Sequence, residues 1–436
     1  MPVAGAAVRQ RQRGPRLTHA LRRPTTENGQ ARDLLLLTLV RVALNTGLRF
    51  VYPFLPALAR GVGVSTRSLS QVVALRALAG LIGPAVGSIS DRRGRRPVMV
   101  AALLLMALGC SMPALAASLG ALALALIAIA MAKAIFDPAL QGWVADRVPY
   151  ASRGRAIAVT ELSWAAALLL GAPACGWLIG AFGWRAPFVA LGLAAGAGAL
   201  AVMTMLAEVA PPDAEGWRRT KAGPAGPTAD GAPRGLDPPT PISLGPLALL
   251  RTDRSIRALT AFIVCLMLGN ELLLVVFGEW LESAFGLRLG ALGLAGVVIG
   301  FAELGGELGV ATIADRLGKR RLVLGAGLLA ALAYLGLPRA GDSLPLALGL
   351  LFIVFLGFEL CYVGFLPIAT ELAPGSRGAL MSIVTAATSL GRALGASAGG
   401  WLYDRGGLGV CSLTAAGLTL LALGLLLRGV AEPAGR

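Results

Sequence analysis

The chain has 436 residues, of which 56% are hydrophobic and 14% are charged, and its mean hydropathy is +0.74. Soluble globular proteins carry about 25% charged residues, so the composition excludes a soluble protein and is typical of a polytopic membrane protein. The net charge of +16 does not indicate a nucleic-acid partner, because Arg and Lys in a membrane protein first report the orientation of its segments.

A basic tail occupies residues 1–33. It contains seven arginines and the sole histidine, His19, and it lacks the apolar core of a signal peptide. We expect this tail to be disordered and cytoplasmic.

Twelve apolar segments follow the tail, each about as long as a membrane-spanning helix requires. The first six make up residues 34–207 and the last six residues 255–428, with a short C-terminal tail at 429–436. The polar stretch between them, 208–254, is rich in Pro, Gly and Ala and is predicted to be a cytoplasmic linker. The predicted fold is therefore all-α, with twelve transmembrane helices in two six-helix bundles. The predicted spans are 34–58, 69–90, 97–117, 119–143, 155–180, 185–207, 256–281, 289–313, 322–338, 344–370, 378–402 and 408–428.

Positive charge is distributed unevenly between the two sides that this order of segments defines. The tails, linker and loops on the side of the N-terminus carry 28 Arg and Lys residues, against 6 on the opposite side. The positive-inside rule then places both termini in the cytoplasm of a multi-pass protein of the cell membrane.

Three sequence blocks of the first half return in the second half at one constant offset. Because each copy holds six helices, an even number, both copies have the same orientation, which is a parallel repeat typical of one large class of transporters. The pairs of blocks are DRRGRR at Asp91 and DRLGKR at Asp315, the Arg-Gly pairs at Arg153 and Arg377, and GAPACGW at 171–177 with GASAGGW at 395–401.

The run GSISDRRGRRP resembles the signature that the major facilitator superfamily carries between its second and third helices. The run GAPACGW is similar to an element of drug/proton antiporters, although Ala172 precedes Pro173 and Trp177 replaces a Gly. The resemblance implies that helices 1, 4, 7 and 10 line a central cavity, and that the charged turn locks the cytoplasmic face. The residues expected to form this lock are Gly87, Asp91, Arg92, Gly94, Arg95, Asp315, Arg316 and Gly318.

Charged residues within the apolar segments are functional candidates, because charge in hydrocarbon is costly and tends to face a cavity. Helices 3, 6, 9 and 12 carry none, the first half is mainly basic, and the second half is mainly acidic. Glu303 and Glu307 are four residues apart and share a helix face. The candidates for the substrate cavity and for coupling are Arg49, Lys133, Asp137, Glu271, Glu279 and Glu359. The candidates for polar pairs between the halves are Arg76, Glu161, Glu303, Glu307 and Arg392.

The function that these patterns favour is a secondary active transporter that moves a small organic solute by alternating access. We expect coupling to protons, through a carboxylate because no membrane histidine is present, with efflux ahead of proton-coupled import of a sugar or organic anion. A non-transporting receptor on the same fold is the alternative of another class. We expect no enzyme activity, catalytic residue, metal or cofactor, and no nucleic-acid partner. The expected partners are the solute, protons and the lipid bilayer around a monomer.

Overall fold

The computed structural model describes residues 27–82, 90, 93–206, 245–373 and 376–430. All regular secondary structure in these residues is helical, as the sequence predicts. The helices of the first half are α1 (Glu27–Arg49), α2 (Leu55–Val62), α3 (Thr66–Ala77), η1 (Leu78–Ile82), α5 (Arg95–Leu115), α6 (Leu119–Arg147), α7 (Tyr150–Ala166), η2 (Ala167–Gly171), α8 (Ala172–Phe182) and α9 (Ala186–Met205). Those of the second half are α11 (Pro246–Thr252), α12 (Arg254–Phe285), α13 (Leu289–Leu317), α14 (Lys319–Gly336), η3 (Leu337–Arg339), α15 (Leu344–Leu372) and α16 (Arg377–Gly429).

Nine helices in the described residues are long and apolar enough to cross a membrane. One of them, α16, contains the eleventh and twelfth predicted segments. These two segments are separated within α16 by non-helical backbone at Gly406 and Gly407, where the chain reverses. Gly407 has a φ of 60° and a ψ of −158°, a conformation that essentially only glycine adopts.

The first two predicted segments are less regular than the sequence suggests. The first is interrupted after Arg49 by turn residues 50–54 and continues as α2, because Pro53 and Pro56 cannot donate the hydrogen bonds of a continuous helix. The second comprises α3 and the 3₁₀ turn η1, and its remainder at 83–89 lies outside the described residues.

Two helix boundaries also differ from the predicted domain limits. Helix α1 begins at Glu27, inside the predicted tail 1–33. Asp33, at the end of this predicted tail, is buried. Helix α11 lies inside the predicted linker 208–254, whose residues up to 244 lie outside the described part of the chain.

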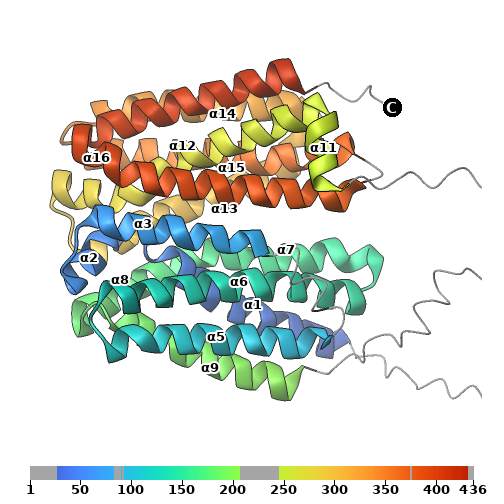
Figure 1. The fold of residues 1–436 in the computed structure, drawn as a ribbon, viewed down its shortest axis with the longest axis vertical. Helices are drawn as coiled ribbons and strands as arrows, with labels where there is room; N and C mark the ends of the chain where they lie inside the picture. Colours follow the sequence, from blue (N-terminus) through green and yellow to red (C-terminus); the bar gives the residue numbers. More distant parts are fainter. Residues whose placement is uncertain (1–26, 83–89, 91–92, 207–244, 374–375, 431–436) are drawn as a thin grey trace, which may run out of the picture.

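The two halves lie side by side as two helical bundles, with the first half in blue to green and the second in yellow to red (Figure 1). One end of the molecule holds the start of α1, the end of α9, helix α11 and the end of α16 (Figure 1). We call this the linker end and the opposite end, where α2 lies, the far end.

The two halves repeat one local geometry at the linker end. Gly94, before α5, has a φ of 90°, and Gly318, before α14, has a φ of 83°. Both values lie in the region that disfavours residues with a Cβ atom. The two glycines of the repeated motif therefore occupy equivalent positions in the fold.

The charged residues that follow these glycines make matching contacts. Arg95 Nε lies 3.2 Å from Asp146 Oδ2 at the end of α6, and Lys319 Nζ lies 3.2 Å from Glu371 Oε1 at the end of α15. Each contact joins the third helix of a half to its fourth, so the repeat seen in sequence is also a repeat in space.

The halves are packed tightly at the far end. The larger hydrophobic core includes Phe50 and Leu55 of the first half together with Phe277 and Leu281 of the second. At Gly278 an added Cβ would lie 2.6 Å from the carbonyl oxygen of Pro53. Such a contact leaves no room for a side chain, so the backbones of the first and seventh segments touch here.

Polar contacts between the halves accompany this packing. Arg60 Nη2 lies 2.8 Å from Glu282 Oε1, and Ser397 Oγ donates a hydrogen bond of 2.8 Å to Gln71 Oε1. Exposed pairs of this kind contribute about 0–1 kcal/mol each. Together with the apolar packing they show that the far end is closed in this structure.

Candidate functional site

A cavity of about 660 Å³ lies between the two halves. It reaches toward the linker end, since Gln141 lies near the end of α6 and Gly378 near the start of α16. Its charged and aromatic lining residues are Tyr52, Arg76, Lys133, Asp137, Tyr362 and Arg392.

A smaller recess of about 150 Å³ adjoins this cavity and shares Leu48, Tyr52, Tyr362, Thr388 and Arg392 with it. We call the two together the central cavity. The recess adds four polar or charged residues to the lining. Three of them, Arg49, Glu303 and Glu359, are predicted site residues, and the fourth is Asn270.

A buried ion pair joins the halves at the recess. Arg49 of α1 contacts Glu303 of α13 through both terminal nitrogens, at 2.6 Å and 2.5 Å. The two side chains are 3% and 5% exposed, so the pair is shielded from water, where bidentate geometry matters most. Arg49 also donates a 3.0 Å hydrogen bond to the carbonyl oxygen of Trp164.

Two further carboxylates neighbour this pair. Glu359 of α15 packs against Gly306, where an added Cβ would lie 2.6 Å from the Glu359 Cβ. Gly306 lies between Glu303 and Glu307 on α13. Neither Glu307 nor Glu359 makes a hydrogen bond or ion pair with a described residue. Three acidic side chains therefore gather on adjacent helices, and one of them holds a cation.

A second chain of contacts crosses the halves next to the recess. Tyr52 donates a 2.6 Å hydrogen bond to Glu271 Oε1, and Arg392 Nε lies 3.5 Å from Glu271 Oε2. Glu271 is fully buried, so its charge depends on these two neighbours. Arg392 thus pairs within its own half in this structure, which differs from the pairing between halves that the sequence analysis predicts.

Arg76 has no counter-ion among the described residues. It is 2% exposed, and neither of its terminal nitrogens has a hydrogen-bond partner there. Its guanidinium lies 5.1 Å from the centre of the Tyr52 ring, a cation–π contact that offsets part of the cost of burying a charge.

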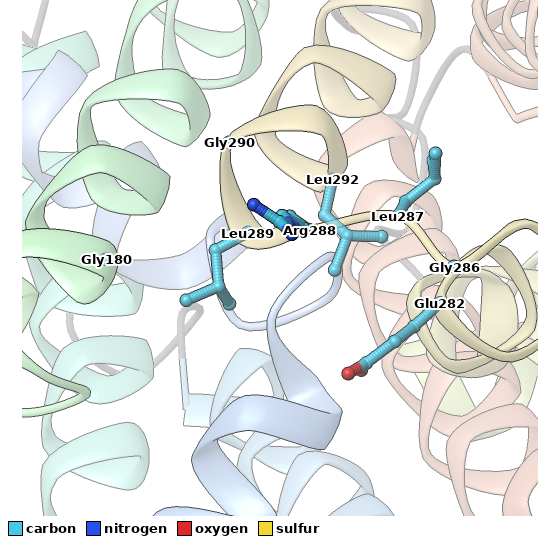
Figure 2. Close-up of a pocket in the computed structure, with 8 residues that line it drawn as sticks. All are labelled: Gly180, Glu282, Gly286, Leu287, Arg288, Leu289, Gly290 and Leu292. Atoms are coloured by element: carbon cyan, nitrogen blue, oxygen red, sulfur yellow. The ribbon is translucent and has the colours of Figure 1, made fainter.

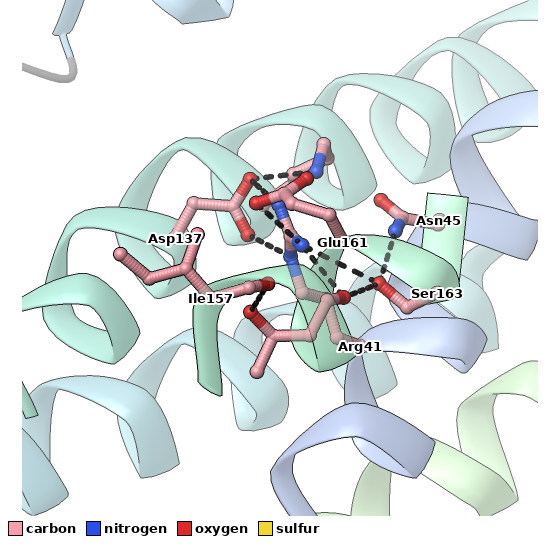
Figure 3. Close-up of polar contacts among 8 residues, drawn as sticks. Arg41, Asn45, Asp137, Ile157, Glu161 and Ser163 are labelled. Atoms are coloured by element: carbon pink, nitrogen blue, oxygen red, sulfur yellow. Dashed lines mark hydrogen bonds and ion pairs between the residues drawn. The ribbon is translucent and has the colours of Figure 1, made fainter. Parts of the chain in front are cut away.

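A polar cluster within the first half surrounds Arg41 (Figure 3). Arg41 contacts Asp137 and Glu161 at 3.0 Å each and donates a 2.8 Å hydrogen bond to the Thr160 carbonyl, while Lys133 lies 2.6 Å from Asp137. Glu161 therefore pairs within its own half in this structure rather than between the halves, because α7 packs against α1 and brings Glu161 to Arg41.

Trp164 connects these groups, and sequence reasoning missed it. Its ring lies 4.2 Å from the Arg49 guanidinium, 5.5 Å from Lys133 Nζ and 5.8 Å from the Arg392 guanidinium. The available signal was a tryptophan inside an apolar segment, three residues after the embedded charge of Glu161.

The antiporter-like run GAPACGW begins at the end of a π-helical turn, Ala167–Gly171. Pro173 cannot donate to the carbonyl of Leu169, and π turns of this kind occur frequently at functional sites. On the facing helix, a Cβ added at Gly293 would lie 3.0 Å from the carbonyl oxygen of Ala172. The small residues of the run therefore let the fifth and eighth segments approach closely.

A separate pocket of about 600 Å³ lies at the far end, around Glu282 and Arg288 (Figure 2). None of the predicted site residues lines it. Glu279, predicted as a cavity residue, is half-buried near this end of α12 and lines none of the pockets described above.

The predicted cytoplasmic lock falls partly outside the described residues. Gly87, Asp91 and Arg92 and the side chain of Asp315 lie there. Gly94, Arg95 and Gly318 have the repeated geometry given above, and Arg316 is exposed. In the described part of the chain no group of three or more His, Cys, Asp or Glu residues is arranged to hold a metal ion.

Comparison with known proteins gives a consistent picture of the family. A sequence profile of the Major Facilitator Superfamily matches residues 37–374 and 259–436. The uncharacterized MFS-type transporter YceJ of Bacillus subtilis (strain 168) is 26% identical over 372 residues, which cover 84% of this chain and 87% of that protein. The class G tetracycline resistance protein of Vibrio anguillarum is 26% identical over 308 residues, covering 67% of this chain and 71% of that protein.

Solved structures share the fold. The human organic anion transporter MFSD10 has a TM-score of 0.63 and 23% identity, covering 91% of this chain and 99% of that one. A D-xylose–proton symporter has a TM-score of 0.70 and 17% identity, covering 92% of this chain and 98% of that one. At these identities the likeness concerns the fold alone.

Proposed function

This chain belongs to the major facilitator superfamily and is a secondary transporter, and we propose that it exports a small organic solute in exchange for protons by alternating access. The linker end is the cytoplasmic end of a protein of the cell membrane, with both termini in the cytoplasm. The structure then represents the state that is open to the cytoplasm and closed at the far end.

The observation that carries the proposal is the buried pair of Arg49 with Glu303, which lies in the cavity wall and joins the two halves. Opening the far end must part these two residues. A separated Glu303 faces the outer solution and takes up a proton there, since the cation that favoured its charged form has moved away.

Closing the far end restores Arg49 beside Glu303 and favours the carboxylate form again. The proton then leaves into the central cavity, which reaches the linker end. Glu359 and Glu307, which hold no cation in the described structure, are placed to receive it. One cycle therefore moves a proton inward and leaves the cavity free to carry a solute outward.

Two findings support export and a structural role for the Arg41 cluster. Relatives at 26% identity include the class G tetracycline resistance protein. The antiporter-like run in the fifth segment points in the same direction as this relative. Asp137, a predicted coupling residue, contacts both Arg41 and Lys133. Since two cations neutralise it, we assign it to holding the helices of the first half together.

The test is flux in proteoliposomes that carry an imposed pH gradient, screened over a panel of solutes. Glu303→Gln and Glu359→Gln should each abolish acceleration by the gradient, and Glu359→Gln should leave exchange of solute at equal pH measurable. Asp342→Asn is the matched control, because Asp342 is an exposed acidic residue in a far-end loop. Gradient-driven flux that survives in both Gln variants would refute coupling through this cluster.

A further inference from the structure

The charges on the cavity wall are unequal. The larger part of the central cavity is lined by the three cations Arg76, Lys133 and Arg392 and by one carboxylate, Asp137. Asp137 and Lys133 satisfy one another at 2.6 Å. Among the described residues of this wall, Arg76 therefore has no counter-ion, and Arg392 has only Glu271 at 3.5 Å.

The helix register places Arg76 and Arg392 at the same level of two facing segments. Gln71 of α3 contacts Ser397 of α16, and a Cβ added at Gly80 would meet the Ser389 side chain. The two segments are thus antiparallel, and the register places Arg76 level with Arg392. Arg76 and Gly80 are four residues apart and share the helix face toward α16.

The counter-charges in the described structure do not balance these groups. Arg392 has Glu271 at 3.5 Å, and that carboxylate already accepts a hydrogen bond from Tyr52. Arg76 has only the face of the Tyr52 ring. A buried charge without a partner is costly, and two like charges side by side raise that cost. An anion between them removes both penalties, and guanidinium groups bind carboxylates in fork geometry.

The other walls are aromatic. Tyr52, Trp164, Phe358 and Tyr362 line the central cavity, and the rings of Phe358 and Tyr362 are stacked at 5.9 Å with an interplanar angle of 4°. Flat apolar walls beside paired cations suit a flat apolar body that carries one acidic group.

We propose that the substrate class is aromatic organic anions, whose carboxylate is bound between Arg76 of the first half and Arg392 of the second. This inference rests on the proposed function, because it names the solute of the same cavity. Binding of the anion from the cytoplasm joins the two halves on the cavity side, so occupancy itself favours closure of the linker end.

The experiment is isothermal titration of the purified full-length protein in nanodiscs with three probes of one shape: 2-naphthoate, 2-naphthamide and 2-naphthylmethylammonium. The carboxylate should bind. The affinities of the amide and the ammonium should be lower than that of the carboxylate by a factor of about ten or more, which is the scale expected for a charge-assisted hydrogen-bonded pair. Arg76→Gln and Arg392→Gln should each reduce naphthoate affinity by a similar factor. Arg339→Gln is the control, because Arg339 is exposed and contacts the Leu335 carbonyl of its own turn.

Thermal melting separates binding from a structural role. Naphthoate should raise the melting temperature of the wild type but not of Arg76→Gln, and Arg76→Gln alone should melt no lower than the wild type because it loses an unpaired buried charge. Arg76→Lys, which keeps the charge without the fork, should recover part of the affinity. The inference is overturned if the folded protein does not bind naphthoate, if the three probes bind alike, or if Arg76→Gln binds naphthoate as the wild type does.

Flux distinguishes this failure from failure of the proposed function. Naphthoate that binds through Arg76 but shows no proton-driven transport supports the anion site and refutes proton-coupled export. Proton-driven transport of a neutral or cationic solute, without naphthoate binding, supports the transport cycle and refutes the anion site.

Discussion

Replacing Glu303 by Gln removes the charge that Arg49 contacts across the two halves. In the described structure the Arg49 guanidinium otherwise has the Trp164 carbonyl and the Trp164 ring. Because the pair is 3% and 5% exposed and bidentate, the variant leaves a buried cation without a carboxylate in direct contact whenever the far end is closed.

The size of the effect follows from that burial. Removing one partner of a buried pair costs about 3–5 kcal/mol, and each 1.4 kcal/mol is about a tenfold change in an equilibrium constant. Since the pair exists in the closed state and is parted in the open one, Glu303→Gln should shift the equilibrium toward far-end opening by roughly two to four orders of magnitude.

Spin labels report this equilibrium directly. Exposed far-end positions are available in each half at Arg185 and Asp342, and the native cysteines are buried apart from Cys265, which is replaced by Ser. Double electron–electron resonance should show a long-distance population in Glu303→Gln that is minor in the parent at neutral pH.

Two further variants make the reasoning refutable. Arg49→Gln should open the far end as well, and the double Gln variant should shift the equilibrium by less than the two single shifts added, because the residues share one interaction. The exposed pair of Arg60 with Glu282 is worth about 1 kcal/mol or less, so Glu282→Gln should shift it by about fivefold at most. Equal shifts in Glu303→Gln and Glu282→Gln would refute the claim that burial sets the strength of the closure.

Three other predictions follow from the packing. Gly278→Ala places a Cβ 2.6 Å from the Pro53 carbonyl oxygen and should also open the far end in the resonance assay, whereas Gly290→Ala, where nothing lies within 4 Å, should not. Asp137→Asn leaves Arg41 and Lys133 without their shared carboxylate, so the melting temperature should fall by several degrees even where gradient-driven flux persists; an unchanged melting temperature would contradict the structural assignment. Gly94→Ala and Gly318→Ala each place an alanine where the backbone has a positive φ, so each should lower the free energy of unfolding by about 1–2 kcal/mol. The control is Gly154→Ala, because an added Cβ there has open space around it.

Much of the fold could be predicted from the sequence because spanning helices are a local property. A run of about 20 apolar residues satisfies its own backbone hydrogen bonds in lipid, so length and composition located the segments. Three features of the helices were not predicted from the sequence: the break after Arg49, the π turn before Ala172 and the early start of α1 at Glu27. Each depends on prolines or polar residues whose effect within an apolar run depends on the neighbouring helices.

The site could be predicted as a set of residues, but its pairs could not. Sequence reasoning selected Arg49, Glu303 and Glu359 because charge in hydrocarbon is costly, and it missed Trp164. It expected Glu161 to cross the halves, yet Arg41 lies closer to it on the neighbouring helix of the same half. Charges can be identified one residue at a time, whereas partners depend on helix rotation and register.

The sequence by itself determined that the chain is a helical membrane protein built from two copies of one six-helix unit, because hydropathy and the constant offset between blocks are properties of the order of residues. The tertiary structure decided that Arg49 meets Glu303, 254 residues away, and that Arg76 lies over the Tyr52 ring with no counter-ion among the described residues. These encounters depend on how helices from two bundles rotate and slide against one another, and that packing is set by contacts distributed over the whole interface.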